Sequence, residues 1–424
     1  MRKVLLVSYY TPPRPGVATS RTRQLRRYLP EFGWDVTTVT ARLDGAADDV
    51  IQTDYLDVSQ ALKKAVGLGS RSAHETLTTA PAPRGTRRSL RQNLIMWGFR
   101  LTSYPDPQVG WFSGGRRTLR SMLATGGYDA IISTSPPFTT NLMIASLQPA
   151  IPWIADFRDL WAERDLRDSR LVKLFDGALE RWTLGSVSAL TTVSEPLARV
   201  LRNHGPGLPV EVIPNAFDAA EWNGVPFASE SRCTIVHAGP MYHGRRDPRP
   251  ILRALRSLLD ERSIVADEVR VDLYAPPEQW LTDLIAEYGL GEVVRLRGTV
   301  SREEVMAAER RADRLVVILW DGPNTEGILT GKIFEYLGAR RRIVAVGGPA
   351  RSVVDDLLAA TGAGVRCTDD QVLKRELLDA VDEHRRGAVR ITESERLQPY
   401  EASTIAASFG QLLDSIAAVK SPVA

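Results

Sequence analysis

Cysteine is scarce in this sequence. Cys233 and Cys367 are the only two in 424 residues, they lie far apart, and they form no metal-binding or redox motif. A disulfide-stapled fold is therefore excluded, and a reducing compartment is expected. No apolar stretch approaches the ~18 residues that a membrane-spanning helix needs, and the apolar run in MRKVLLVSYYTPP is too short for a signal-peptide core. We expect a soluble, cytoplasmic protein that can still lie on the inner face of a membrane.

Neither sign of charge dominates. The chain has 54 basic and 51 acidic residues, which gives a net charge of +3. This balance argues against a surface built for a polyanion, so nucleic acid is not an expected partner. The hydrophobic share of 43% and the charged share of 25% are typical of a globular protein. The length suits two domains of roughly 200 residues each.

Several motifs that would indicate a reaction are also missing. There is no Asp-Xaa-Asp, so the metal clamp of metal-dependent sugar transferases has no candidate. The five histidines, at positions 74, 204, 237, 243 and 384, have no metal-ligand spacing. No P-loop and no Gly-x-Gly-x-x-Gly follows a predicted strand, which counts against kinases, P-loop ATPases and dinucleotide dehydrogenases. We expect no metal and no other cofactor.

The chain does have an alternation of short apolar or β-branched runs with helical patterns, which is typical of parallel sheets covered by helices. The strands predicted for the first half are 3–8, 34–40, 129–134, 152–156, 189–193 and 210–213. Those predicted for the second half are 233–238, 269–274, 293–297, 315–320, 342–346 and 364–366. The predicted fold is α/β, with two doubly wound Rossmann-like domains that face each other across a cleft.

The domain boundaries follow from changes in this pattern. A first Rossmann-like domain is predicted for 1–225, interrupted by a mobile or helical insertion over about 41–110. Periodicity stops near 217–233, where small polar residues gather, and a second domain is predicted for 226–395. The remaining residues, 396–424, contain an amphipathic helix that can cross back onto the first domain.

The insertion ends in an arginine-rich helical pattern over 84–101. One stripe is apolar, and arginines stand before and within it; the stripe comprises Leu90, Leu94, Trp97 and Leu101. One interpretation is a surface helix that touches anionic lipid or a lipid-linked acceptor. The simpler interpretation is a helix packed on its own domain with solvated arginines.

The most informative stretch is NTEGILTGKIFEYLGARRRIVAV, residues 324–346. A helix that begins at Thr330, Gly331 and Lys332 presents its first amides, which have no partner within the helix, to an anion. Glu335 lies about one turn further, on roughly the same side as Gly331. A phosphate with a hydroxyl-bearing group beside it would satisfy both, which describes a nucleotide diphosphate and its ribose.

A second loop with glycine and positive charge follows strand 233–238. Gly239 opens this loop, and Arg245 and Arg246 stand within it. A guanidinium offers a planar fork to phosphate oxygens, although with two adjacent candidates at least one is merely solvated. Together with Lys332, the other would stabilise the charge that develops on a diphosphate when a sugar–phosphate bond breaks.

The first half offers loops of the same kind. Gly16 follows strand 3–8 and lets a ligand approach the backbone closely before the next helix. Asp156, Arg158 and Asp159 stand at the end of a later strand, at the edge where this class of fold places function. Either these charges face an acceptor, or an arginine–carboxylate pair only braces the loop.

These loops, in this order, resemble the retaining glycosyltransferases of family 4, which have the two-domain GT-B fold. The likeness covers nearly the whole chain except about 41–110. It rests on YYTPPRPGVAT, IISTSPPFTTNLMIAS, IPWIADFRDLW, LTTVSEPLARVLR, VEVIPNAFD and, most specifically, GKIFEYLGARRRIVAVGG. The resemblance implies that Gly16 lies near the donor phosphate and that Glu335 holds the ribose hydroxyls.

The glutamates depart from the family pattern. The family often has two of them eight positions apart, with the first beside the sugar. Eight positions before Glu335 stands Gly327, and Glu326 is one position off. Either the loop shifts its register or the first glutamate is absent, as in some branches, so the contact to the sugar hydroxyls is open.

Two other positions also differ. Where the family often has Gly-Arg after the first strand of its second domain, this chain has Gly239-Pro240, which moves the cation role to Arg245 or Arg246. The histidine often found in the acceptor loop is replaced around Arg158 and Asp159.

The resemblance implies a metal-independent, retaining transfer of a sugar from a nucleotide diphosphate, most often uridine-linked, to a hydroxyl acceptor. Acceptors of this kind are glycans in polysaccharide biosynthesis, lipid-linked intermediates and small metabolites. The catalytic candidates are Arg245, Arg246, Lys332, Asp159 and Arg158. The donor-binding candidates are Gly16, Gly239, Thr330, Gly331, Lys332, Glu335 and Glu326, and the acceptor-side candidates are Asp156, Arg158 and Asp159. A sugar-nucleotide epimerase of the same fold and a catalytically silent nucleotide-sugar-binding subunit remain as alternatives.

Overall fold

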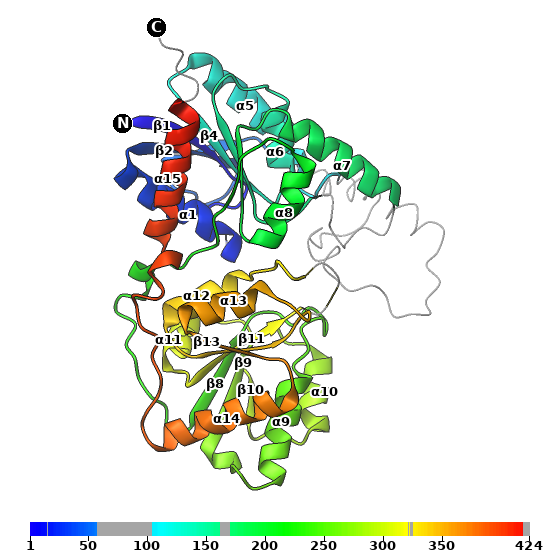
Figure 1. Cartoon of the computed structure of the whole chain (residues 1–424), viewed down its shortest axis with the longest axis vertical. Helices are drawn as coiled ribbons and strands as arrows, with labels where there is room; N and C mark the ends of the chain where they lie inside the picture. The colour runs from blue at the N-terminus through cyan, green and yellow to red at the C-terminus, as the bar shows by residue number, and fades with distance from the viewer. Residues whose placement is uncertain (15, 57–103, 162–169, 321, 323–324, 419–424) are drawn as a thin grey trace. The chain divides into compact units, whose positions relative to one another are not determined.

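The computed structural model describes residues 1–14, 16–56, 104–161, 170–320, 322 and 325–418. The chain forms two compact units (Figure 1). The first comprises Met1–Pro214 and the C-terminal segment from Ile405 onward, and the second comprises Asn215–Thr404. The helix predicted over 84–101 lies outside the described residues. Among the described helices, none is long and apolar enough to cross a membrane.

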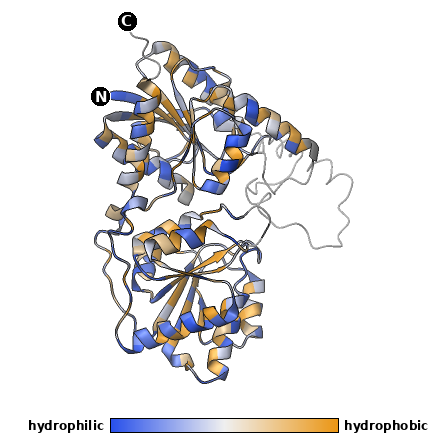
Figure 2. Cartoon of the chain, in the orientation of Figure 1, coloured by the Kyte–Doolittle hydropathy of each residue, from blue (hydrophilic) through white to orange (hydrophobic). Residues whose placement is uncertain are grey.

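The first unit is built on a seven-stranded parallel sheet with the order β3-β2-β1-β4-β5-β6-β7. Its strands are β1 (Arg2–Val7), β2 (Trp34–Ala41), β3 (Val50–Thr53), β4 (Ala130–Ser135), β5 (Trp153–Phe157), β6 (Ala189–Thr192) and β7 (Val210–Val212). The central strands are buried along most of their length, because helices cover both faces of a parallel sheet. Figure 2 shows them as hydrophobic segments within each unit.

One described strand, β3, is absent from the sequence-based prediction. It lies at the edge of the sheet and pairs in parallel with β2, in the register Thr38↔Val50. Only its first and last residues are buried, so four residues give neither an alternating nor a continuous apolar pattern. The first sheet therefore extends into the range that the sequence analysis treats as an insertion.

The helical segments of the first unit lie between its strands. They are η1 (Val17–Thr19), α1 (Ser20–Tyr28), η2 (Leu29–Phe32), η3 (Val109–Trp111), α5 (Phe112–Thr125), α6 (Thr139–Ala145), α7 (Arg170–Leu184) and α8 (Glu195–His204). The last helix of the chain, α15 (Ala402–Ala418), packs on this unit from Ile405 onward. Its Phe409 is fully buried, and its Asp414 accepts a hydrogen bond of 2.8 Å from the Trp34 indole.

The second unit has a six-stranded parallel sheet with the order β10-β9-β8-β11-β12-β13. Its strands are β8 (Cys233–Ala238), β9 (Val269–Tyr274), β10 (Val294–Leu296), β11 (Arg314–Leu319), β12 (Ile343–Gly347) and β13 (Gly364–Cys367). Both sheets are parallel and covered by helices, so the doubly wound α/β prediction is confirmed for each unit.

Two apolar cores lie on the two faces of this second sheet. One face packs against α9 (Arg249–Asp260), α10 (Gln279–Glu287) and α14 (Asp370–Arg385). The other packs against α11 (Arg302–Arg311), α12 (Gly331–Ala339) and α13 (Val353–Thr361). Short 3-10 segments complete the unit: η4 (Ala219–Trp222), η5 (Ala266–Glu268) and η6 (Gln398–Tyr400).

The two ends of the second unit are paired with each other. Phe217 and Glu401 form an isolated parallel bridge. The Phe217 amide donates to the Tyr400 carbonyl at 3.1 Å, and the Ala402 amide donates to the Phe217 carbonyl at 2.8 Å. The outgoing and the returning stretches of chain therefore run side by side.

Candidate functional site

The start of α12 is the place where the sequence predicts an anion-binding site. The helix begins at Gly331, after an extended Thr330 whose side chain makes no capping hydrogen bond. The predicted start at Thr-Gly-Lys is therefore confirmed. The first amides of such a helix have no acceptor within the helix, and the helix dipole adds positive potential there. The start of α12 is suited to an anionic group.

Lys332 and Glu335 lie on one face of α12, as their spacing predicts. The Lys332 ammonium lies 2.7 Å from Glu335 Oε2, and the side chains are 20% and 9% exposed. Burial lowers the pKa of Lys332, but the charges of Glu309 and Glu335 outweigh burial and raise it overall. Lys332 is therefore a permanent cation, held beside a carboxylate.

A third member of this cluster, Glu309 on α11, is missed by the sequence analysis. Its side chain is fully buried, and Oε1 lies 3.5 Å from the Lys332 ammonium. Burial is the main cause that raises the pKa of Glu309 to about 8, and the charge of Glu335 adds to it. The signal was present, because Glu309 stands on the apolar stripe of its helix, one turn after Val305 and Met306.

Arg302, at the start of α11, completes the cluster. Its guanidinium lies 3.4 Å from Glu335 Oε1 and donates a 2.6 Å hydrogen bond to Glu221 of η4. Glu335 is thus placed between an ammonium and a guanidinium. Each oxygen of Glu335 contacts a cation, so the carboxylate is held in one orientation. In that orientation it can accept hydrogen bonds from the hydroxyls of a ligand.

The glycine loop after β8 holds the two candidate arginines in different places. Arg245 is exposed and stacks over the Trp320 ring at 4.6 Å. Arg246 is partly buried; its guanidinium lies over the Tyr242 ring at 4.9 Å and 3.4 Å from the Pro240 carbonyl. Gly239 has a φ of +145°, a conformation that side-chain-bearing residues rarely adopt.

Two buried side chains connect this loop to α12. Tyr336, which follows Glu335, accepts a 2.9 Å hydrogen bond from the Ala238 amide. Burial raises the pKa of Tyr336 well above its usual value, and the charge of Arg246 opposes this rise only in part. His237 lies between carbonyl oxygens of Val316 and Gly239, at 2.9 and 3.2 Å. Burial lowers the pKa of His237 to about 4, and the charges of Arg246 and Lys332 act in the same direction. Arg246 and Lys332 therefore both lie close enough to act on one neutral imidazole.

Glu326 lies outside the regular elements of this unit. Its side chain is exposed, and its carbonyl accepts a 3.0 Å hydrogen bond from the Val353 amide. Its backbone is therefore fixed by the start of α13. The role predicted for its carboxylate stays a prediction.

In the first unit the structure brings Gly16 and Arg158 together. Gly16 has a φ of +105° and is exposed, and its carbonyl accepts hydrogen bonds from Thr19. The Arg158 guanidinium donates a 3.1 Å hydrogen bond to the Ala18 carbonyl in the same loop. Arg158 therefore fixes the loop that Gly16 opens.

The two aspartates that flank Arg158 have different environments. Asp156 is fully buried, accepts a 2.8 Å hydrogen bond from Thr191, and lies 3.4 Å from Arg21 of α1. Its carboxylate braces β5 against α1 and β6, through Arg21 and Thr191 and not through Arg158. Asp159 is exposed.

Among the described residues, no three His, Cys, Asp or Glu side chains lie close enough together to hold a metal ion. Three of the histidines instead pair with carboxylates: His204 with Glu180, His243 with Glu278 and His384 with Asp313.

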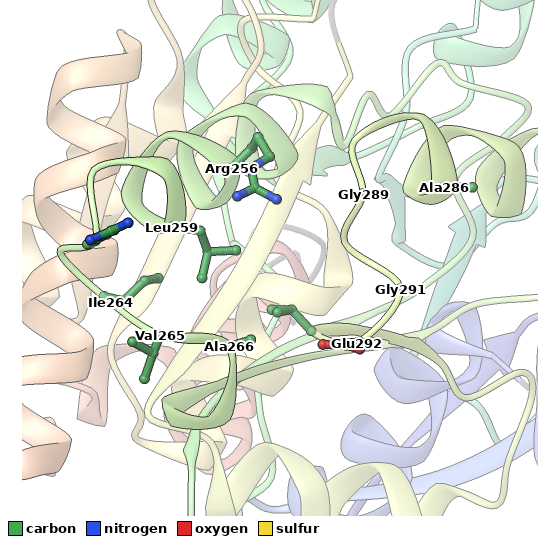
Figure 3. Close-up of a pocket in the computed structure, with 11 residues that line it drawn as sticks. Arg256, Leu259, Ile264, Val265, Ala266, Ala286, Gly289, Gly291 and Glu292 are labelled. Carbon is green, nitrogen blue, oxygen red and sulfur yellow. The ribbon is translucent and has the colours of Figure 1, made fainter.

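A separate pocket of about 620 Å³ lies at the other end of the second sheet (Figure 3). It lies beside the starts of β9 and β10, and apolar side chains such as Leu259 and Ile264 line it together with Arg256 and Glu292. Ligands of doubly wound folds bind at the carboxyl ends of the strands, where Gly239 and Trp320 stand. The pocket is thus distinct from the cluster that Lys332, Glu335, Glu309 and Arg302 form around the start of α12.

Comparison with known proteins agrees with this architecture. Residues 16–216 match the family model described as a glycosyl transferase 4-like domain. Sucrose-phosphate synthase from Thermosynechococcus elongatus is similar with a TM-score of 0.62 at 14% identity, over 99% of this chain and 100% of that chain. HepE from Anabaena, solved in complex with UDP, has a TM-score of 0.58 at 14% identity, over 98% and 100% of the two chains.

A third structure has the same fold. The UDP-forming α,α-trehalose-phosphate synthase from Burkholderia vietnamiensis has a TM-score of 0.59 at 12% identity, over 99% of this chain and 100% of that chain. A search of curated protein sequences gives no match. At these identities the likeness shows the fold, which is the GT-B arrangement of two Rossmann-like domains.

Proposed function

From the match of residues 16–216 to the glycosyl transferase 4-like domain, we propose that this chain is a retaining glycosyltransferase. It moves a sugar from a nucleotide diphosphate to a hydroxyl acceptor. The observation that carries the proposal is the Lys332–Glu335 pair at the start of α12, with 2.7 Å between ammonium and carboxylate. A nucleoside diphosphate needs a cation for its phosphates and a carboxylate that accepts hydrogen bonds from its ribose hydroxyls, and both stand here at a helix N-terminus.

In this proposal each group of the second unit has one task. The α12 amides, Lys332 and Arg246 bind the diphosphate and stabilise the negative charge that it gains as the sugar departs. Glu335 accepts hydrogen bonds from the ribose hydroxyls. We assign the phosphate role to Arg246 and not to Arg245, because Arg246 and Lys332 both act on His237, whereas Arg245 is exposed and stacks on Trp320.

Retention is proposed because the family resemblance implies it and because the leaving phosphate can serve as the base. That phosphate takes the proton of the acceptor hydroxyl on the face from which it leaves, so the protein need supply no nucleophile. Gly16, which opens the loop that Arg158 fixes, is proposed to approach the donor phosphate. Asp159, exposed at the end of β5, is the proposed acceptor-side carboxylate.

Uridine is the nucleoside that we propose for the donor. Support comes from the structural neighbours, of which one was solved with UDP and another is UDP-forming. The proposed setting is polysaccharide biosynthesis in the cytoplasm. Contact with a membrane surface through 84–101 stays a proposal that concerns residues outside the described ones.

Turnover of a panel of nucleotide sugars, with and without acceptor extracts, tests this function. A transferase consumes the donor only when the acceptor is present. An epimerase of the same fold acts on the donor alone, and a silent binding subunit turns over nothing. A thermal-shift screen of UDP-, GDP- and ADP-sugars comes first, because it identifies the donor without an acceptor.

Metal independence is the first prediction. Excess EDTA should leave sugar transfer within about twofold of the untreated rate, because Lys332 and Arg246 supply the positive charge that a metal would otherwise place on the diphosphate. Transfer measured before and after chelation, then after added Mg²⁺ or Mn²⁺, checks it. Loss of transfer with EDTA and its return with metal would show that these two cations do not suffice.

Glu335→Ala should weaken UDP binding about 10- to 100-fold, since a hydrogen bond to a charged group contributes ~1.5–3 kcal/mol. Calorimetry with UDP and with its 2′- and 3′-deoxy analogues makes the test specific. The wild type should lose affinity for a deoxy analogue, and the variant should not distinguish it from UDP. Glu303→Ala, an exposed carboxylate on α11, serves as the control. Equal discrimination by both proteins would rule out the ribose role.

A further inference from the structure

Glu309 has an environment that neither the family resemblance nor the fold explains. It is fully buried, and neither oxygen of its carboxylate has a hydrogen-bond partner. A buried carboxylate without hydrogen bonds is costly unless it is neutral or compensated. The cation beside it is the Lys332 ammonium, at 3.5 Å.

The charges around Glu309 come from several elements. Lys332, Glu335 and Tyr336 face it from α12, and Arg302 acts on it from its own helix, α11. Glu221 of η4 binds Arg302, Arg246 of the β8 loop acts on Tyr336, and Arg246 and Lys332 both act on the His237 imidazole. Lys332 is therefore shared by two carboxylates, of which Glu335 makes the shorter contact, at 2.7 Å.

We propose that Glu309 is a positioning residue that holds or releases Lys332 according to its own protonation. The inference rests on the proposed function, because it assigns Lys332 to the diphosphate. When Glu309 is neutral, Lys332 is bound by Glu335 alone and can turn to the phosphates of the donor. When Glu309 is ionised, two buried carboxylates hold the ammonium, and the diphosphate must compete with both.

The direction of the pH dependence follows from the surroundings. Burial and the neighbouring Glu335 raise the pKa of Glu309 to about 8, while Lys332 and Arg302 oppose the shift. Below that pH Glu309 is mostly neutral and Lys332 is available. As the pH rises through the pKa, the carboxylate ionises, the hold on Lys332 strengthens, and affinity for a diphosphate falls.

Glu309→Gln separates this role from a structural one, because glutamine has the shape of the neutral acid and cannot ionise. UDP binding is measured by calorimetry from pH 7 to pH 9 in the wild type and the variant. At pH 7 the two should agree within about twofold, and at pH 9 the wild type should bind roughly tenfold more weakly than the variant. Any change in the protonation of UDP affects both proteins equally at a given pH, so it cancels when the variant is compared with the wild type.

Two controls complete the experiment. Glu376→Gln, which removes an α14 carboxylate that is paired with Arg342, should keep the wild-type pH dependence. Infrared difference spectra of the ligand-free proteins should show a protonated carboxylic acid that titrates near pH 8 in the wild type and is lost in Glu309→Gln. Parallel pH profiles for the two proteins, or no such band, would overturn the role of Glu309.

The design separates this inference from the proposed function. If no sugar is transferred but the pH profiles diverge as described, the function is wrong and the positioning role stands. If transfer occurs and the pH profiles stay parallel, the proposed function stands and the positioning role of Glu309 is wrong. Inorganic pyrophosphate is the second probe, and a wild type that binds neither it nor UDP contradicts both.

Discussion

Lys332→Ala is expected to lower sugar transfer by about 10²–10³-fold, because one preorganised donor to a developing anion contributes about that much. In the proposed reaction, the attraction between the Lys332 ammonium and the diphosphate strengthens as the sugar–phosphate bond lengthens. The loss should therefore fall on kcat more than on KM, since a contact that strengthens toward the transition state lowers the barrier. Initial rates over a range of donor concentrations, at saturating acceptor, measure both constants.

The matched control is Lys374→Ala. Lys374 is an ammonium of the same kind in the same unit, paired with Glu261 on the other face of the sheet, and its loss should leave transfer unchanged. Thermal unfolding of both variants shows whether the protein stays folded after Lys332 is removed from between Glu309 and Glu335. A folded Lys332→Ala variant with wild-type kcat would exclude Lys332 from the reaction.

Asp156→Ala should reduce the free energy of unfolding by about 3–5 kcal/mol, because it leaves the buried Arg21 guanidinium without its counter-charge. Burial already lowers the pKa of Arg21, and Asp156 is the charge that opposes this shift. The Thr191 hydroxyl also loses its acceptor. Urea denaturation, followed by tryptophan fluorescence and by circular dichroism, measures the change.

Asp159→Ala is the natural control, since the same residue type lies three positions later and is exposed. Its unfolding free energy should stay within about 0.5 kcal/mol of wild type, while transfer to the acceptor should fall if the acceptor-side role is right. Equal stability of the two variants would show that the Arg21–Asp156 pair contributes little to the fold.

The fold could be predicted almost element by element because its strands are buried on both faces. A strand such as β11, which is buried along its whole length, gives the apolar run Leu315–Leu319, whose short length and β-branched residues indicate a buried strand. Strand β3 escapes detection for the opposite reason. It is short, lies at the edge, and is held by pairing with β2, which is a tertiary contact and leaves little trace in the local pattern.

The candidate site could be predicted only where it is local in sequence. Lys332 and Glu335 belong to one helix, so helical periodicity places them together. Glu309 reaches them only because α11 packs beside α12, and no spacing rule gives that contact. Likewise, the sequence shows two aspartates around Arg158, but the position of Arg21 on α1 decides which one is buried.

In sequence, the second unit is inserted between two segments of the first, and the pairing of Phe217 with Glu401 joins the two ends of the insert. A protein expressed as residues 1–214 would lack α15 and would leave Trp34 without the Asp414 acceptor. The reverse excision is simpler, because residues 215–404 are continuous in sequence and their ends are already hydrogen-bonded to each other. Insertion of one Rossmann-like domain into a loop of another would leave this connectivity, and the second unit, which is continuous in sequence, is the one that can be moved intact.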